Sequence, residues 1–503
     1  MKEEGEGGRI DLFSMSSLLL HRGPSIQIPV PAPSSIPHVR GRGNADVPRA
    51  VEGSQPAALY SSHECIGDMS TIKPRAQRIC LLRHVCMDTT SSAFSYYRDP
   101  NAAQMPIVFD KRYGHIFSFG HVAPKGGRED LLPLNKHVRY KRHLRWSPKM
   151  VDGPVPSDTH VLHKLHLVSA PFVPTNLGHL AWEEAFPLLL GMAQLGIYED
   201  ASKTVVLRTH ACNESVGSID RGDGTESKES PPTRSEAHLC HKFLEGFMRP
   251  LGALTTVSGL AAQHAAAGRR HVCFERVVVG GYYDMFNAEH HAGKEPWLQL
   301  YRQRVLAHHA LAPPPPSLGF APPPTAHSFI IVNKQGRRGI YNFDEVVAYL
   351  RAACKGLCHG VEKAVQPVAF HTMSVREQLR IVSTATIALS PPGGVSMILP
   401  FLPEGAHAIL INYMVGEGAD TSRLRGTEGT CAKCSLTMEA ALWRHVRHVR
   451  TLFYQVWDEG DFAPGRSGKR KRASIGRDSP VVVKEERLGF LVRVALDKMA
   501  RPE

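Results

Sequence analysis

The chain has 503 residues, too many for a single hydrophobic core, so its length predicts at least two domains. Its hydrophobic share of 42% is sufficient for a globular protein, and it lacks the run of about 18 apolar residues that a membrane-spanning helix needs. The formal net charge of +13 favours an anionic partner such as a nucleic acid, a membrane surface or a phosphorylated substrate, although scattered basic residues can also simply solvate a surface.

Two dense basic runs occur, at residues 136–146 and 469–472. The second is similar to a nuclear localisation signal, but segments containing glycine and serine flank it, as in a solvated insert. No recognisable nucleic-acid-binding module surrounds either run, so we expect no nucleic-acid partner. A nuclear basic protein whose signal is residues 469–472 remains an alternative.

The first 60 residues are rich in glycine, proline and serine and predict a disordered lead-in. They show no signal peptide or membrane anchor, because residues 1–5 are acidic and the apolar run at residues 17–20 is too short. Taken literally, this predicts a soluble and unexported chain. A trimmed or misassigned N-terminus would look the same.

Ten cysteines favour a different compartment. Several are clustered, which is typical of disulfides in an oxidising lumen. A glycosylation sequon at residues 213–215 fits a lumenal protein, although one such sequon is expected by chance. Alternatively, Cys431, Cys434, His445 and His448 could hold zinc, but their spacings are shorter than zinc fingers usually show.

In the N-terminal half, residues 65–146 alternate short strand-like runs with turns. Alternating hydrophobicity predicts a half-buried strand at residues 161–168. A helical pattern follows at residues 178–195, with Thr175 or Asn176 as the N-cap. The further elements expected here are strands at 204–207 and 273–280 and a surface insertion at 213–234.

A proline-rich segment at residues 311–326 predicts a semi-rigid linker between two domains. The second domain has the clearest pattern, since strands at 329–332, 367–370, 387–389 and 407–411 alternate with helices at 343–354, 374–384 and a short one ending near 401. Such alternation predicts a parallel sheet whose ligands bind at the carboxyl ends of the strands. The expected organisation is a lead-in at 1–60, an N-terminal α/β domain at 61–310, the linker, a C-terminal α/β domain at 327–462, a basic disordered insert at 463–480, and a closing strand and helix at 481–503.

One loop at this expected sheet edge carries the dipeptide Gly393-Gly394. Glycines let backbone amides approach a ligand closely, and the helix that follows through Val395 and Ser396 offers N–H groups and a dipole to a phosphate. The alternative is an ordinary turn from strand to helix. We expect an anion here, the diphosphate of a nucleotide sugar.

A second loop, at residues 334–342, follows the strand at 329–332 of the same sheet. It carries Arg337 and Arg338, whose guanidinium groups could pair with a diphosphate. A solvated basic loop is the alternative. A glycine-rich loop and an arginine-rich loop at one sheet edge are more informative together than either is alone.

A third candidate lies on the predicted helix at 178–195. His179 and Glu183 are four residues apart and share one helix face, so together they could remove a proton from an acceptor hydroxyl. A surface His–Glu pair is the alternative. Asp284, which follows the strand at 273–280, is a weaker candidate and is expected to be a solvated loop residue.

These three segments resemble glycosyltransferase family 61, which includes protein O-linked N-acetylglucosaminyltransferases of the endoplasmic reticulum and plant xylosyl- and arabinosyltransferases of the Golgi. The resemblance runs from about residue 65 to 454. The positions that match the family's motifs are Asn176, His179, Glu183 and Glu184 in the helix, Arg337, Arg338 and Asn342 in the arginine-rich loop, and Gly393 with residues 401–406 near the glycine turn. Pro392 departs from the family, because it replaces a histidine and has neither a donor nor a titratable group.

The resemblance implies an α/β fold of GT-B type, with two Rossmann-like domains and the active site in the cleft between them. It implies inversion at the sugar, no cofactor and no required metal ion. Glu183 is the expected base, with Glu184 and His179 as alternatives, and Asn176 lies on the acceptor side. The residues expected to bind the nucleotide sugar are Arg337, Arg338, Asn342, Gly393, Gly394, Val395 and Ser396.

The expected function is an inverting glycosyltransferase that moves a sugar from a nucleotide sugar, expected to be UDP-linked, to a hydroxyl of a glycan or protein. By resemblance it acts in the lumen of the Golgi or endoplasmic reticulum. It would associate with a membrane only through an N-terminal anchor missing from this sequence. The alternative is a non-catalytic relative that binds a nucleotide or glycan without turnover.

Overall fold

The computed structural model describes residues 58–66, 79–101, 117–119, 144–146, 148–169, 174–214, 232–280, 295–311, 327–334, 338–357, 365–412, 443, 446–456, 459–463 and 479–500. Residues 54–503 form one compact unit. Several expectations fall outside the described residues, namely the lead-in, most of the linker, of the surface insertion and of the basic insert, Asp284, Arg337, Cys431, Cys434 and His445. No helix in the described part of the chain has the length and apolarity needed to cross a membrane.

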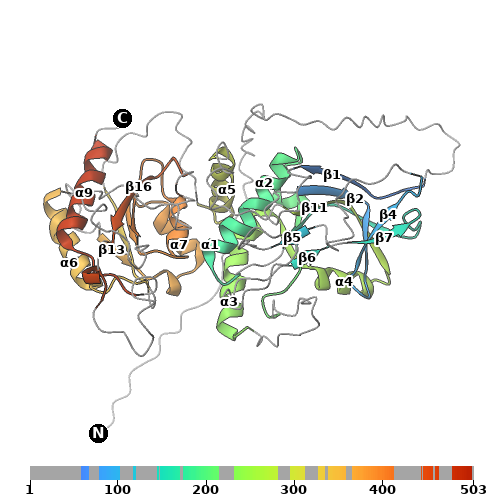
Figure 1. Cartoon of the computed structure of the whole chain (residues 1–503), viewed down its shortest axis with the longest axis horizontal. Coiled ribbons are helices and arrows are strands. Elements are labelled where there is room, and N and C mark those ends of the chain that lie inside the picture. The colour runs from blue at the N-terminus through green and yellow to red at the C-terminus, as the bar shows by residue number, and fades with distance from the viewer. Residues whose placement is uncertain are drawn as a thin grey trace, which may run out of the picture. The chain divides into compact units, whose positions relative to one another are not determined.

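The larger sheet has a parallel core (Figure 1). Its strands are β8 (His160–Ser169), β9 (Thr204–Arg208), β10 (Ala253–Thr256) and β11 (His271–Gly280), in the spatial order β10-β9-β8-β11. Counted from β8, this is the order 3-2-1-4 of a Rossmann half-fold. The strands predicted at 161–168, 204–207 and 273–280 are confirmed.

Shorter strands from the beginning of the described chain extend this sheet beyond β11. They are β1 (Ser62–Ile66), β2 (Ile79–Arg83), β3 (Val85–Asp88), β4 (Phe94–Arg98) and β7 (Lys149–Asp152), while β5 (Phe117–Phe119) and β6 (Leu144–Trp146) form a separate pair. The helices of this half are α3 (Arg234–Phe243), the π-helix η4 (Leu244–Met248), the 3-10 turns η3 (Ala201–Lys203) and η5 (Arg249–Leu251), α4 (Val257–Ala266) and α5 (Glu295–His308).

Three disulfides join elements of this half of the chain, within the described residues. Cys65–Cys80 connects β1 to β2, Cys86–Cys273 connects β3 to β11, and Cys212–Cys240 connects the turn after β9 to α3. The expectation of disulfides is therefore confirmed for the clustered Cys65, Cys80 and Cys86, and Cys212, Cys240 and Cys273, which stand apart in the sequence, are disulfide-bonded as well.

The helix predicted at 178–195 is a continuous helical segment of three parts: α1 (Leu177–His179), the π-helix η2 (Leu180–Ala185) and α2 (Phe186–Gln194). Asn176 is the N-cap, because its side-chain oxygen accepts a hydrogen bond from the Gly178 amide at 2.9 Å. A π-turn inside a helix is rare and is often found at functional sites. The wider turn lies where the predicted acidic pair lies.

The second sheet is wholly parallel, as the alternation predicts. Its strands are β12 (Phe329–Val332), β13 (Val365–Val368), β14 (Ile387–Ser390), β15 (His407–Asn412) and β16 (Arg450–Gln455), in the order β13-β12-β14-β15-β16. The strand predicted at 367–370 is shifted, because Phe370–Thr372 forms a 3-10 turn and Pro367 lies within β13. Since β13 is an edge strand, the missing N–H of that proline is tolerated.

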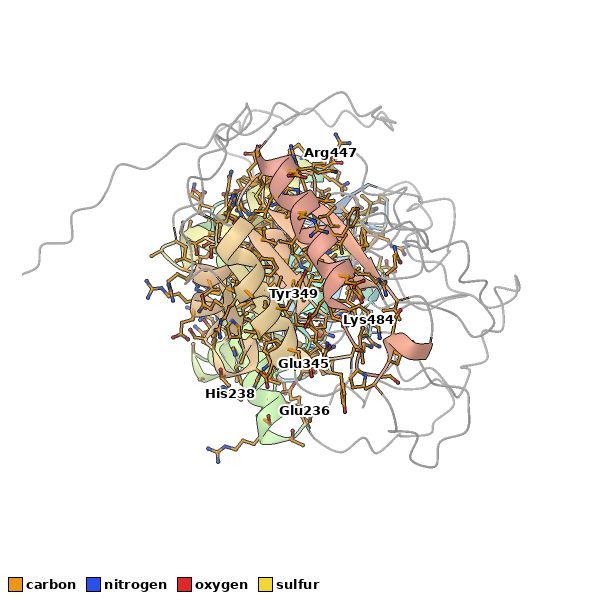
Figure 2. All side chains as sticks on the ribbon, turned by 90° about the vertical axis from the view of Figure 1, so that its left-hand side faces the viewer. Glu236, His238, Glu345, Tyr349, Arg447 and Lys484 are labelled. Carbon is orange, nitrogen blue, oxygen red and sulfur yellow. A yellow bond between two sulfur atoms is a disulfide. The ribbon has the colours of Figure 1, made fainter. Side chains whose placement is uncertain are left out.

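Side chains of the second sheet alternate between two layers of helices. Phe329 and Ile331 pack with α6 (Phe343–Leu357) and α9 (Glu485–Ala500), while Ile330 and Val332 pack with α7 (Val375–Val382). Ser374 closes a capping box with Glu377 at the start of α7. The closing helix α9 lies beside α6, where Tyr349 is labelled (Figure 2).

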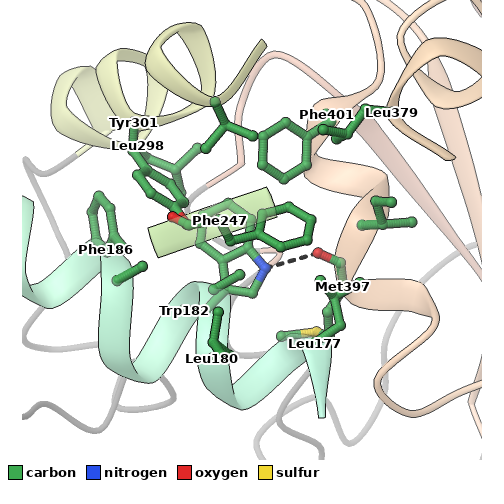
Figure 3. Close-up of a cluster of buried hydrophobic side chains, with 14 of the residues drawn as sticks. Leu177, Leu180, Trp182, Phe186, Phe247, Leu298, Tyr301, Leu379, Met397 and Phe401 are labelled. Carbon is green, nitrogen blue, oxygen red and sulfur yellow. Dashed lines mark hydrogen bonds between the residues drawn. The ribbon is translucent and has the colours of Figure 1, made fainter. Parts of the chain in front are cut away.

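One hydrophobic cluster contains residues from both sheets' helices (Figure 3). Trp182 and Phe186 of the helical segment after β8 and Tyr301 of α5 pack in it with Met397 and Phe401 of η8 (Ser396–Phe401). The Trp182 indole donates a hydrogen bond to the Met397 carbonyl at 2.7 Å. The helix that carries the predicted acidic residues is therefore fixed directly to the segment that follows the glycine turn.

Candidate functional site

The strand order of the second sheet locates its ligand-binding edge. From β12 the chain moves outward to β13 on one side, and then returns to β14 on the other side of β12. Ligands of such sheets bind where the order reverses, outside the carboxyl ends of the two strands at that point. Here those ends are Val332 and Ser390, so Lys334 and the Gly393-Gly394 turn lie at the reversal.

Lys334 connects the two loops at this edge. Its ammonium donates a hydrogen bond to the carbonyl of Pro392 at 2.7 Å. Gly393 has φ +113°, a conformation that side chains rarely adopt, and a Cβ there would lie 2.9 Å from the Lys334 Nζ and 3.9 Å from the Arg338 Nη1. Two cations therefore converge on the glycine turn, and the absence of a side chain at Gly393 makes room for them.

The element after the turn differs from the expected helix. Ser396–Phe401 is a six-residue 3-10 helix with Pro400 inside it, so its dipole is smaller than that of a full α-helix. Ser396 is buried, and both its amide and its hydroxyl donate to the Gly393 carbonyl, at 3.0 and 2.8 Å. Val395 packs half-buried against the core. The Ser396 amide and hydroxyl are therefore engaged within the turn, and the charged groups nearest to Gly393 are the side chains of Lys334 and Arg338.

The arginine-rich loop contains one described arginine of the predicted pair. Arg338 lies half-buried with φ 62°, in the left-handed region that residues other than glycine rarely adopt. Arg337 lies outside the described residues.

Asn342 has a structural contact in place of its predicted contact with the nucleotide sugar. Its side-chain amide donates to the Val483 carbonyl and its side-chain oxygen accepts from the Val483 amide, both at 2.9 Å. This paired contact attaches the segment before α9 to the start of α6. The geometry gives no support to the predicted role of Asn342 as a ligand residue.

Asn176, which caps the helical segment after β8 of the larger sheet, contacts the glycine turn of the second sheet. A Cβ at Gly394 would lie 2.5 Å from the Asn176 Oδ1, so the two residues are in close contact and only glycine fits at position 394. The neighbouring Gly178 is equally close to Met397, at 2.8 Å from a built Cβ to the Met397 Cγ. The segment predicted on the acceptor side, at Asn176 and Gly178, therefore directly contacts the segment predicted on the donor side, at Gly394 and Met397.

His179 and Glu183 form a dyad one turn further along this helix. The imidazole Nδ1 and the Glu183 Oε2 share a short hydrogen bond. The Glu183 side chain is 4% exposed and that of His179 is 12% exposed, so the imidazole is the more accessible member. The prediction that the two share a helix face is confirmed, and the alternative of a surface pair is wrong, because both side chains are largely buried.

Glu184 faces a different partner. Its Oε2 lies 3.7 Å from the Nη2 of Arg208, the last residue of β9, and both side chains are almost fully buried. Burial lowers the pKa of the Arg208 guanidinium, and the Glu184 carboxylate opposes that shift. A carboxylate that neutralises a buried arginine is poorly placed to accept a substrate proton, so the structure does not support Glu184 as the base.

Lys334 and Arg208 are the functional candidates that the sequence patterns missed. Each follows or ends a strand, where a basic residue usually predicts a solvated loop. The position of Lys334 just after β12 is a signal that could have identified it, since the neighbouring arginines were selected for the same reason. The contact of Arg208 with Glu184 is tertiary and leaves no trace in the sequence.

The described residues contain no group of three or more histidine, cysteine or acidic side chains that could hold a metal ion. Of the four residues considered for zinc, His448 is described. Its Nε2 lies 2.9 Å from the Pro400 carbonyl, and burial lowers its pKa to about 3, which keeps the ring neutral. His448 therefore supports the end of η8 within the core.

Residues 167–409, which include both the dyad and the glycine turn, match the family model Glycosyltransferase 61. No curated protein matches the chain.

Two solved structures are similar to the chain. One is the bacterial iron-containing dodecameric glycosyltransferase TibC from enterotoxigenic E. coli H10407, with 13% identity, 68% of this chain and 77% of that chain covered, and a TM-score of 0.26. The other is the dodecameric iron-containing heptosyltransferase TibC in complex with ADP-D-β-D-heptose, with 12% identity, 69% and 80% covered, and a TM-score of 0.26. The family resemblance predicted from the motifs is confirmed by the family model, and the segment at residues 167–409 belongs to glycosyltransferase family 61.

Proposed function

We propose that this glycosyltransferase moves a sugar from a UDP-linked donor to a hydroxyl of a glycan or protein, with inversion at the sugar and without a metal ion or other cofactor. The observation that carries the proposal is the contact between Asn176 and Gly394. It places the dyad of one α/β half beside the glycine turn of the other. A GT-B arrangement, with the reaction between two Rossmann-like domains, accounts for that juxtaposition.

On the donor side, the diphosphate binds at the reversal of strand order. The Lys334 ammonium and the Arg338 guanidinium lie around Gly393 and neutralise the negative charge that develops as the leaving group departs. Preorganised positive charge at that position stabilises the transition state more than the bound donor, because the leaving oxygen is more negative in the transition state than in the bound donor.

On the acceptor side, the dyad accepts the proton. Since the Nδ1 of His179 is hydrogen-bonded to the Glu183 carboxylate, the Nε2 carries the lone pair. The acceptor hydroxyl gives its proton to that nitrogen as its oxygen attacks the anomeric carbon, and the bond from that carbon to the diphosphate oxygen breaks with its electron pair on the departing UDP. Glu183, the base expected from the sequence, then stabilises the imidazolium.

The experiment is a turnover assay with a panel of UDP-sugars, by hydrolysis and by transfer to glycan and protein acceptors. Turnover of one donor that disappears in His179→Gln and is reduced in Lys334→Ala supports the proposal. UDP binding without turnover for any donor favours the second candidate, a non-catalytic relative. Pro392 is the observation that favours that candidate, because it removes the histidine of the family motif.

A further inference from the structure

The two adjacent glutamates on the π-helix η2, Glu183 and Glu184, contact different partners. Glu183 faces His179 and Glu184 faces Arg208, because adjacent residues of a helix point in different directions. The two carboxylates share one turn of backbone, so the position of one constrains the position of the other. Arg208 contacts the neighbour of the dyad's carboxylate and not the dyad itself.

Arg208 is held from two sides. It is 2% exposed, and beyond the carboxylate of Glu184 its Nη1 lies 3.9 Å from the sulfur of Cys212 and 3.8 Å from that of Cys240. These two cysteines form the disulfide between the turn after β9 and α3. Sulfur is a weak acceptor, so the disulfide restricts where the guanidinium lies more than it stabilises its charge.

The ion pair between Arg208 and Glu184 contributes little net stability to the core. Removing two charges from water costs desolvation free energy. At a separation of 3.7 Å, and with no direct hydrogen bond from the Arg208 Nη2, the attraction between the charges offsets little of that cost. Well-packed apolar residues would stabilise this position at least as well. A buried ion pair that does not serve stability is best explained by a requirement for one particular arrangement of η2.

We propose that Arg208, held against the Cys212–Cys240 disulfide, is a positioning residue that orients η2 through Glu184 so that the Glu183 carboxylate meets the His179 Nδ1. This inference rests on the proposed function, in which the dyad accepts the acceptor proton. The disulfide is part of the device, because without it the side of Arg208 away from Glu184 loses its support.

The test uses the full chain in four variants: Arg208→Met, Arg208→Lys, Glu183→Gln and, as a matched control, Arg487→Met. Arg487, on α9, also pairs with a buried carboxylate, that of Asp461 at 3.1 Å, although Arg487 itself is only partly buried. The readouts are kcat and KM for the UDP-sugar turned over best, and the downfield Nδ1 proton resonance of His179, assigned by its loss in His179→Gln. The resonance reports the hydrogen bond to Glu183 whether or not a substrate is known.

We expect Arg208→Met to lower kcat by about tenfold to a hundredfold with KM within about twofold, and to remove the Nδ1 resonance. Arg208→Lys restores part of both, and Arg487→Met changes neither although it destabilises the fold. Unchanged kcat and an unchanged resonance in Arg208→Met overturn the inference. If Glu183→Gln leaves turnover intact, the proposed function itself fails, so the two failures are distinguishable.

The disulfide is tested separately. Cys212→Ala combined with Cys240→Ala is expected to reproduce part of the Arg208→Met loss, whereas Cys65→Ala combined with Cys80→Ala, which removes the disulfide between β1 and β2, leaves the Nδ1 resonance in place. If both double variants lose the Nδ1 resonance to the same extent, the Cys212–Cys240 disulfide acts only on global stability. It would then have no part in positioning Arg208.

Discussion

The two halves of the site hold their charges in different ways. Around Gly393, the cations of Lys334 and Arg338 lie half-buried on the loop that follows β12 of a parallel sheet. On the helix, Glu183 and Glu184 are buried and each faces a defined partner. Binding at the first half should tolerate a conservative exchange, because a cation of similar reach still neutralises a phosphate. Proton transfer at the second half should not, because it depends on one geometry.

The largest expected effect is at the dyad. Replacing Glu183 by Gln removes the charge that stabilises the imidazolium, so we expect kcat to fall about a hundredfold to ten-thousandfold while the Kd for UDP changes little. Steady-state turnover and isothermal titration with UDP measure the two quantities. A parallel loss of UDP affinity would contradict the division of the site into two halves.

The next effect is at the contact between the halves. Gly394→Ala places a Cβ against the Asn176 Oδ1, so we expect UDP to bind about tenfold more weakly and turnover to fall with it. The matched control is Asn176→Ala combined with Gly394→Ala, in which the clash is absent and UDP affinity should recover. If the double variant is as impaired as the single one, the contact with Asn176 is not the reason for the glycine.

An effect of similar size on UDP binding is expected for the lysine at the donor edge. Lys334→Ala should weaken UDP binding by about tenfold, which corresponds to roughly 1.4 kcal/mol, and reduce its salt dependence, while Lys334→Arg retains most of the affinity. Lys484→Ala is the control, because that lysine lies on the segment before α9 and donates to the Gly460 carbonyl. Equal affinities of the Lys334→Ala and wild-type proteins at low salt would place the diphosphate elsewhere.

The last prediction concerns stability and not binding, at the packing that joins the halves. Trp182→Phe removes the hydrogen bond from the indole to the Met397 carbonyl and leaves that buried carbonyl without this donor. We expect the free energy of unfolding to drop by about 1–3 kcal/mol, with a matching shift of the urea midpoint. Phe186→Leu, a change in the same cluster that breaks no hydrogen bond, is the comparison. An unchanged urea midpoint in Trp182→Phe would mean that the bond does not stabilise the junction.

The local rules predicted most of the fold. The second sheet follows from apolar strands alternating with capped helices, and Asn176 and Ser374 are caps because their side chains can accept from amides two or three residues later. The 3-10 form of Ser396–Phe401 was missed because a short apolar run gives no periodicity that separates it from an α-helix. Its internal proline is a signal that could have been used.

The site was predicted less completely, because its decisive contacts join residues far apart in the chain. Lys334 and Pro392 are 58 residues apart. Glu183 is buried and not on the surface because of the whole cluster around Trp182. The motif places Glu183 and Glu184 side by side as equals, and nothing in the sequence assigns Arg208 to one of them. Asn342 shows the converse, since its place in a motif did not reveal that it binds Val483.

The most direct test of the central claim is a crystal structure of the full chain with UDP bound. The account predicts diphosphate density within hydrogen-bonding distance of the Lys334 Nζ and the Arg338 guanidinium, against the Gly393-Gly394 turn and on the side facing His179. Density for UDP at any other place, or saturating UDP that leaves this turn empty while binding is measurable in solution, would contradict it.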